Sequence, residues 1–397
     1  MMSNAVMTSA ERWLTYLAVS SSVVLVGLSL GVSLPLVSLR LEAQGYGTFA
    51  IGIMAAMPAF GTLIGARLTG LLAARLGGPR SLQLSLLLSA VAVAGLSLVP
   101  NYWVWLLLRL LLGSCLTITF VLGESWINQL ADERYRGRWV ALYGTGFAVS
   151  QLLGPLLLAL LGTATDAGFW LSAALLVGGI FLLIGRQGAP VVDANAAVGK
   201  GLIGFIRAHP ALAWAVILFA AFESMVLTLL PVYALQQGYT EALALTIVSV
   251  VVIGDACLQL PIGWLADRVS RTRLYAVSGV VLLSTCVAMP MALHSWLLWP
   301  LLVLFGASAG GLYTLSLILV GEHFRDTALV RANAFIAMLW GVGALLGPTS
   351  TGAASQWLTG HALPWLLALG ALWFLWLLKR YPLFAAHSQE AKDGSLA

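Results

Sequence analysis

Charged side chains are scarce in this sequence. Asp, Glu, Lys and Arg make up 9% of the 397 residues, whereas they make up about 25% of a typical soluble domain. Hydrophobic residues make up 60%, which excludes a soluble enzyme or nucleic-acid-binding protein despite the formal net charge of +5. Cysteine is almost absent as well. Cys115, Cys257 and Cys286 lie in separate apolar runs, which excludes a disulfide framework and a clustered metal site and predicts three small buried side chains.

Long apolar runs are what the sequence has instead. A helix crosses the ~30 Å hydrocarbon layer of a membrane with about 20 mainly apolar residues. Runs such as 81–99 are apolar on every side, so they predict helices and exclude the alternating strands of a membrane barrel. We therefore expect an all-α membrane protein. Twelve spans are predicted, at residues 14–38, 48–73, 81–99, 102–124, 138–162, 167–186, 210–234, 242–266, 274–293, 296–320, 331–355 and 361–379.

The basic residues predict the orientation of these spans. If the N-terminus lies in the cytoplasm, 17 of the 20 Lys and Arg residues fall on cytoplasmic segments, while Arg40 lies outside and Arg67 and Arg109 lie within spans. Cytoplasmic loops typically carry such an excess of basic residues. Both termini are therefore expected in the cytoplasm, which requires an even number of spans and agrees with twelve.

The two halves of the chain repeat each other at an offset of 193 residues, and the match is free of gaps over a useful length of each half. Two similar six-span bundles can rock about a site between them, so that the site faces each side of the membrane in turn. The expected divisions are an N-terminal bundle at 1–186, a cytoplasmic linker at 187–209, a C-terminal bundle at 210–380 and a cytoplasmic tail at 381–397. The matched residues include Gln44-Gly45-Tyr46 with Gln237-Gly238-Tyr239, Gly61 with Gly254, Arg138 with Arg331, and Gly154-Pro155 with Gly347-Pro348, in which glycine and proline are expected to shape helix packing.

One loop of each half carries a motif. In residues 263–273 (GWLADRVSRTR), a glycine is followed four residues later by Asp267-Arg268 and then by further basic residues. This segment resembles the loop signature of the major facilitator superfamily. The copy at 70–80 keeps two arginines but has Ala74 where that family usually has aspartate.

Other motifs extend the resemblance over essentially the whole chain. Arg109 with Gly113 is similar to the arginine-glycine pair of that superfamily's fourth helix. Gly146 with Gly154-Pro155 is similar to a fifth-helix signature common in exporters that work as antiporters. The resemblance implies that superfamily's fold of two pseudo-symmetric six-helix bundles. Three segments resemble its poorly characterised YcaD-like bacterial branch, at residues 123–125, 260–263 and 310–313.

Charged residues gather at the predicted cytoplasmic ends of the spans in both halves. Carboxylate and guanidinium groups at a partly dehydrated interface form bidentate hydrogen bonds, so we predict a latch that closes this side in one state. The alternative is a set of ordinary interfacial charges, each pair worth ~0 to 1 kcal/mol. The predicted gate consists of Glu124, Arg138, Arg75 and Arg80 in the first half and of Asp267, Arg268, Arg273, Glu322 and Arg331 in the second.

Three ionisable residues lie deep inside predicted spans: Glu223, Asp255 and Arg109. Such a group costs at least ~2.5 kcal/mol near the centre of a spanning helix unless it is paired or hydrated. We predict Glu223 as the principal proton-coupling group and Asp255 as the second choice. The alternative for Glu223 is a structural hydrogen bond, and for Asp255 a polar seam shared with Gln259. Arg109 is left open between binding an anionic substrate, pairing with a carboxylate and capping helix carbonyls.

The resemblance also implies which residues surround a substrate. In that superfamily the first, fourth, seventh and tenth spans line a central path, and residues on the fifth and eleventh spans can flank it. The predicted substrate cavity consists of Arg109, Gln259, Tyr313, Thr228, Met225, Trp340 and Gln151.

Together these patterns predict a secondary active transporter that moves a small organic solute by alternating access. The sequence has no glycine-lysine loop for phosphate, so we expect the proton gradient to drive it, with no cofactor and no metal. We expect a monomeric exporter (antiporter) in the bacterial inner membrane, with a small-molecule substrate, protons and the lipid bilayer as its partners and no nucleic acid. The alternatives are a proton-coupled importer or a uniporter and, from another class, a membrane-embedded receptor or enzyme. The enzyme alternative is disfavoured because the five histidines are scattered over loops and helix ends.

Overall fold

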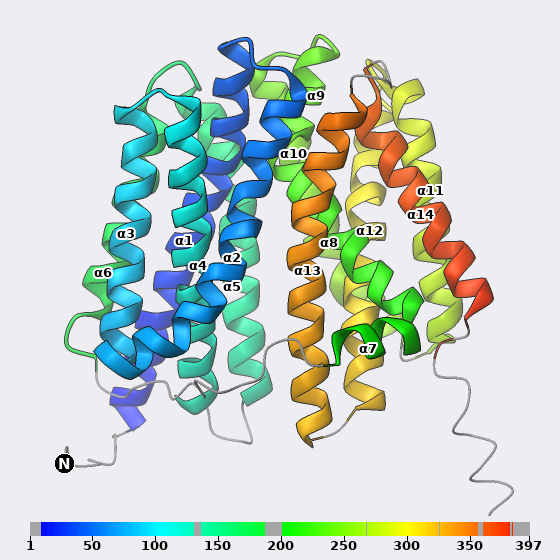
Figure 1. Cartoon of the computed structure of the whole chain (residues 1–397). Helices are drawn as coiled ribbons and strands as arrows, with labels where there is room; N and C mark the ends of the chain where they lie inside the picture. Colours follow the sequence, from blue (N-terminus) through cyan, green and yellow to red (C-terminus); the bar gives the residue numbers. More distant parts are fainter. Residues whose placement is uncertain are drawn as a thin grey trace, which may run out of the picture. The chain divides into compact units, whose positions relative to one another are not determined.

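The computed structural model describes residues 9–130, 136–186, 201–266, 268–324, 326–355, 360–381 and 383. Every regular element in these ranges is a helix, as predicted. The chain divides into two compact units (Figure 1), one of residues 1–196 with 239–249 and the other of residues 197–238 with 250–397.

The described part of the first unit consists of six helices and the start of a seventh, α10. Within it, α1 packs against α4, α5 and α6, α2 packs against α4, and α3 packs against both α4 and α6. The helices are α1 (Ser9–Ala43), α2 (Thr48–Leu76), α3 (Gly78–Leu98), α4 (Tyr102–Leu130), α5 (Arg136–Leu161) and α6 (Ala167–Leu183).

The second unit uses equivalent helix pairs. There α8 packs against α12, α13 and α14, and α11 packs against α12 and α14. Helix α10 begins in the first unit and continues in the second. The helices are α7 (Leu202–Ala208), α8 (Pro210–Thr228), α9 (Leu230–Gln236), α10 (Glu241–Ala266), α11 (Arg271–Ala292), α12 (Leu298–His323), α13 (Asp326–Ala354) and α14 (Ala362–Arg380).

Glycines bring the backbones of paired helices into contact. A Cβ on Gly113 of α4 would overlap the backbone of Pro58 on α2. A Cβ on Gly306 of α12 would likewise overlap the carbonyl of Val251 on α10. The repeated loop also has a shared backbone requirement, because Gly45 and Gly238 both adopt positive φ, at 80° and 85°, a conformation that glycine reaches without steric cost.

The helices have the dimensions of membrane spans. Ten helices in the described ranges are long and apolar enough to cross a membrane. Helix α6, with 17 residues, and helix α10, with 26, occupy the positions of the other two predicted spans, so the total of twelve stays a prediction. Leu160 and Met291 are each 86% exposed, which fits side chains that face lipid.

The structure differs from the expected spans at two places. The predicted seventh span, 210–234, is broken at Leu229 into α8 and α9. Pro231 stands in the first turn of α9, a position that suits proline because its missing N–H would have no partner there. In addition, the short helix α7 lies inside the segment that we expected to be a linker.

One expected burial was wrong. Cys115 and Cys286 are buried, but Cys257 is exposed. Its position on α10 turns its side chain away from the neighbouring helices, a direction that the apolar sequence around it does not specify.

Candidate functional site

A half-buried carboxylate and a half-buried indole meet in the second unit. The Trp340 Nε1–H donates a hydrogen bond of 3.1 Å to Oε2 of Glu223. Glu223 lies on α8 and Trp340 on α13. At Gly343 and Gly347 of α13 the two helices lie so close together that a Cβ on either glycine would overlap α8. The glycines therefore bring the indole within reach of the acid.

A second carboxylate faces the first. Asp255 on α10 lies close enough to Glu223 for the two charges to repel each other. A Cβ on Gly310 of α12 would overlap the Asp255 carboxylate. Glycine at this position therefore leaves the space that the Asp255 side chain occupies. Three helices, α8, α10 and α12, thus place two acids together in an apolar bundle.

Two neighbouring carboxylates have a definite chemistry. Ionising both in an apolar environment costs both desolvation and mutual repulsion, so the pair favours a state in which one acid carries a proton. The acids then titrate as a pair and not as two separate groups. Such a pair can take up and release a proton, and it can also hold a cation.

Three other predicted cavity residues of the second unit make contacts within that unit, and their role in a cavity stays a prediction. Thr228 donates a hydrogen bond of 2.5 Å from Oγ1 to the Ser224 carbonyl, one turn earlier on α8. The Met225 sulfur accepts a hydrogen bond of 3.4 Å from Thr351. The Tyr313 ring stacks on the Phe219 ring, with 4.6 Å between their centroids.

Two further cavity predictions concern glutamines. The Gln259 side chain lies outside the described residues. The Gln151 backbone carbonyl on α5 lies where a Cβ on Gly31 of α1 would be, so this residue marks the close contact of α1 with α5.

The first unit contains a different buried charge. Arg109 on α4 is 1% exposed. Its Nε and Nη1 atoms have no hydrogen-bond partner among the described residues. A guanidinium in such a position attracts anions strongly. Two buried N–H groups without a partner are what an anion would satisfy, and the choice among the three roles of Arg109 stays a prediction.

Among the described residues, the predicted cytoplasmic gate includes an ion pair. Glu322, at the end of α12, forms an ion pair with Arg271, a residue that the sequence analysis did not single out. Arg331 instead lines a small cavity with several aromatic residues. Arg271 is the first residue of α11. Because the sequence alone does not show where that helix begins, it does not show which arginine reaches α12.

The remaining gate residues are spread over the helix ends. The Arg268 guanidinium stacks over the Trp264 ring, 3.7 Å from its centroid. The other described side chains of the group are exposed, namely Arg75, Arg80, Glu124 and Arg273. Asp267 and the Arg138 side chain lie outside the described residues.

The proximity of the two acids has no counterpart in the sequence predictions, whereas the bond from Trp340 is a structural hydrogen bond of the kind that the sequence analysis gave as the alternative role of Glu223. The proximity of Glu223 to Asp255 and the bond from Trp340 join residues of three different helices.

Within the described ranges, no group of three or more His, Cys, Asp or Glu residues is placed to hold a metal ion.

Comparison with known proteins agrees with this architecture. The chain matches the family model of the Major Facilitator Superfamily over residues 19–253 and 241–395. It is 28% identical over 372 residues to an uncharacterized MFS-type transporter of Enterobacter sp. strain 638, covering 92% of this chain and 96% of the relative. It is also 28% identical to the uncharacterized MFS-type transporter YcaD of an Escherichia coli strain, covering 90% and 93%. The resemblance to the YcaD-like branch is therefore confirmed.

Solved structures show the same fold. A mutant of the nucleoside transporter NupG superposes with a TM-score of 0.76 at 12% identity, covering 93% of this chain and all of the other. A D-xylose-proton symporter superposes with a TM-score of 0.75 at 15% identity, covering 93% and 97%. At this level of identity the likeness concerns the fold alone.

Proposed function

The chain belongs to the major facilitator superfamily, and from this premise we propose that it is a proton-coupled secondary transporter that exports a small organic solute by alternating access. The observation that carries the proposal is the pair of acids, Glu223 and Asp255, which lie close enough in the second unit for their charges to interact. The surrounding helices have the length and composition of membrane spans. An unneeded pair of charges there would be selected against on energetic grounds, because each costs several kcal/mol unless it is paired or hydrated.

Glu223 is the principal proton-coupling group in this proposal. Its hydrogen bond from Trp340 stabilises the ionised form, whereas the apolar surroundings and Asp255 oppose it. The acid therefore has two accessible states whose balance depends on what else enters the site. Binding of a cationic or polar solute favours the ionised acid, and loss of the proton favours the solute in turn, by reciprocal linkage.

Asp255 has a supporting role. Its carboxylate fills the space beside Gly310, and its charge opposes ionisation of Glu223. Asp255 becomes the coupling group only if Glu223 serves solely to form a structural hydrogen bond. In either arrangement the pair exchanges protons as a unit.

Arg109 provides the complementary charge. An anionic or strongly polar group of the solute binds the buried guanidinium through charge-assisted hydrogen bonds. The exposed arginines and acids at the helix ends form the cytoplasmic gate, to which we add Arg271 because it pairs with Glu322.

The direction of transport is inferred from the glycine-proline pair, Gly154-Pro155, on α5. Proton-coupled import and uniport are the alternatives within transport. The proposed protein works as a monomer in the bacterial inner membrane with both termini in the cytoplasm. A membrane-embedded receptor or enzyme remains the alternative from another class.

A two-step experiment tests this function. A thermal-shift screen of the purified full-length protein against metabolites and drugs first identifies a ligand. Proteoliposomes with an imposed pH gradient then report solute flux, and a pH-sensitive dye inside them reports proton movement. We expect solute and protons to cross the membrane in opposite directions. Binding without flux would favour a receptor, conversion of the solute would favour an enzyme, and flux without proton movement would favour a uniporter.

A further inference from the structure

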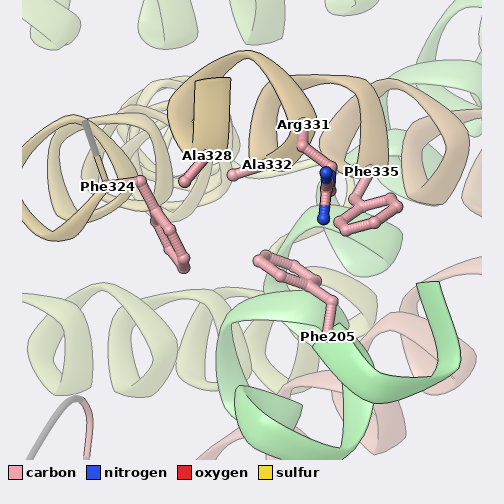
Figure 2. Close-up of a pocket in the computed structure, with 6 residues that line it drawn as sticks. All are labelled: Phe205, Phe324, Ala328, Arg331, Ala332 and Phe335. Atoms are coloured by element: carbon pink, nitrogen blue, oxygen red, sulfur yellow. The ribbon is translucent and has the colours of Figure 1, made fainter. Parts of the chain in front are cut away.

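A small cavity lies at one end of the second unit, away from the pair of acids. Its volume is about 230 Å³, below the ~300 Å³ at which pockets for whole drug-sized ligands begin. It therefore fits part of a larger molecule. Figure 2 shows its lining residues, Phe205, Phe324, Ala328, Arg331, Ala332 and Phe335.

The cavity walls are aromatic. The Phe205 ring lies 5.3 Å from the Phe335 ring and 6.1 Å from the Phe324 ring, measured between centroids. The His209 ring contacts Phe205 and Phe324 edge to face, at 5.4 and 5.7 Å. Burial and the nearby His323 lower the pKa of His209, so at neutral pH this ring is uncharged and extends the apolar wall.

One cation stands among these rings. Among the residues that the structure describes, Arg331 is the only charged one that lines the cavity. Its side chain projects beside the Phe335 ring toward the side where Phe205 lies (Figure 2). Within the part of the chain that the structure describes, Arg331 forms no ion pair. The cavity thus joins an apolar slot to a guanidinium, a combination that suits an anion with an apolar body.

The position of the cavity identifies the source of such an anion. Three predicted membrane spans of this unit meet there: the one that ends at His323, the one that begins at Arg331 and the one that begins at Pro210. The cavity therefore lies at the level of lipid headgroups. In the orientation proposed above, this is the cytoplasmic side, where anionic lipids give the membrane surface its negative potential.

Helix α7 adds a second, independent observation. Only Phe205 of this helix is buried, whereas Ile203 is 67% exposed and Arg207 is exposed as well. A short helix that exposes an apolar and a basic side chain at the end of membrane spans is suited to lie in the lipid interface. The wall that carries Phe205 is thus in contact with lipid.

We infer that this cavity binds one anionic phospholipid of the cytoplasmic leaflet. The phosphate accepts hydrogen bonds from the Arg331 guanidinium, and the adjoining glycerol and first acyl carbons lie among the three phenyl rings. The bound lipid fixes α7 against α13 and α12. This site is separate from the pair of acids and does not depend on whether those acids couple protons.

Native mass spectrometry of the full-length protein in detergent tests the inference. The probe is phosphatidylglycerol, and zwitterionic phosphatidylcholine of the same acyl chains is the comparison. Arg331→Gln removes the guanidinium. The matched control is Arg380→Gln, because Arg380 is an exposed arginine at the end of a span in the same unit. We expect Arg331→Gln to bind phosphatidylglycerol about tenfold more weakly, the loss typical of one charge-assisted hydrogen bond, and Arg380→Gln to bind it as the unaltered protein does.

Two further arms keep the test decisive. Phe205→Leu keeps an apolar side chain and is expected to weaken phosphatidylglycerol binding while Arg331 is intact; circular dichroism and gel filtration check that each variant is folded. Equal phosphatidylglycerol binding by Arg331→Gln and Arg380→Gln would overturn the proposal. Equal affinity for the two lipids would overturn it too. Binding of free laurate in place of phosphatidylglycerol would show a soluble amphipathic anion as the ligand, against a lipid.

Discussion

The two units of this protein have the same helix pairs but carry charges of opposite sign within their helices, Arg109 in the first and Glu223 with Asp255 in the second. The offset of 193 residues relates Gly113 on α4 to Gly306 on α12, and each glycine brings its helix against the backbone of a neighbour. The offset also relates Gly154 on α5 to Gly347 on α13. A Cβ on Gly154 would overlap α1, and a Cβ on Gly347 would overlap α8. The packing of the units is therefore repeated at the level of single residues.

The charges within the helices are not repeated. At the same offset, Glu223 corresponds to Leu30 and Asp255 to Thr62. Neither position of the first unit therefore carries an acid, which shows that the helix pairs form without one. The comparison separates two kinds of residue: glycines that the architecture needs in both units, and charges that only one unit has.

The largest effect is expected from removing an acid of the second unit, since the first unit has no acid at the corresponding position. Glu223→Gln keeps the size and the hydrogen-bonding capacity of the side chain but cannot titrate. We expect it to reduce gradient-driven transport at least ~100-fold while sparing exchange of substrate across proteoliposomes, because exchange needs no net proton movement. Asp255→Asn is expected to have a smaller effect. Glu42→Gln, at the end of α1, is the control for loss of one acid.

Other outcomes would reassign the roles of the two acids. Normal proton-driven transport by Glu223→Gln, with loss in Asp255→Asn, would move the coupling role to Asp255. Normal transport by both variants would eliminate the proton hypothesis in favour of facilitated diffusion or another ion.

The next effect tests whether the packing is really shared. Gly113→Ala and Gly306→Ala each place a methyl group against a neighbouring backbone. Each is expected to destabilise the protein by ~1–3 kcal/mol, as overpacking does, and to lower the melting temperature to a similar extent. Gly144→Ala and Gly321→Ala are the controls, since a Cβ at these helical positions meets nothing within 4 Å. Unequal destabilisation would mean that the two repeated glycine contacts do not contribute equally to stability.

A third change makes the first unit resemble the second. Arg109→Leu introduces the residue type of its counterpart, Leu302. Replacing a buried charge with an apolar side chain is often neutral or stabilising, so the melting temperature should hold or rise. If Arg109 binds the solute, the KM for transport should increase at least ~10-fold. A lower melting temperature with an unchanged KM would instead assign Arg109 a structural role.

The smallest effect concerns pH. His209 corresponds to Tyr16 in the first unit. Because burial lowers the pKa of His209 in the folded protein, the unfolded chain takes up the proton first as the pH falls. The stabilisation is therefore complete above about pH 6.5 and decreases as the pH falls through the lowered pKa. His209→Gln should flatten the melting temperature between pH 8 and pH 5.5. An unchanged slope in this variant would assign the pH dependence to other groups.

The repeated glycines and the apolar runs explain why much of the fold could be predicted. Apolar runs of about 20 residues indicate spanning helices because the membrane leaves no other way to satisfy the backbone. The break of the seventh span could not be predicted in this way, since Pro231 lies within an apolar run just as Pro35 and Pro58 lie inside the unbroken helices α1 and α2.

The arrangement of the site could be predicted only in part. Charge inside an apolar run singles out Glu223, Asp255 and Arg109 without a structure. Their mutual distances depend on the rotation and spacing of separate helices, which glycine contacts set. The pairing of Glu322 with Arg271 depends in the same way on where α11 begins. The lipid cavity gave no signal, because Phe205 and Phe324 look like any other apolar residues in such a sequence.

The glycine contacts also affect how such a protein can change during evolution. At Gly113 and Gly306 the helices touch through their backbones, so the spacing of the bundle does not depend on large side chains at these points. A mutation that moves, adds or removes a polar group one turn away leaves that spacing unaltered. New solute preferences can therefore arise in one half by single substitutions, while the other half continues to provide an unchanged scaffold.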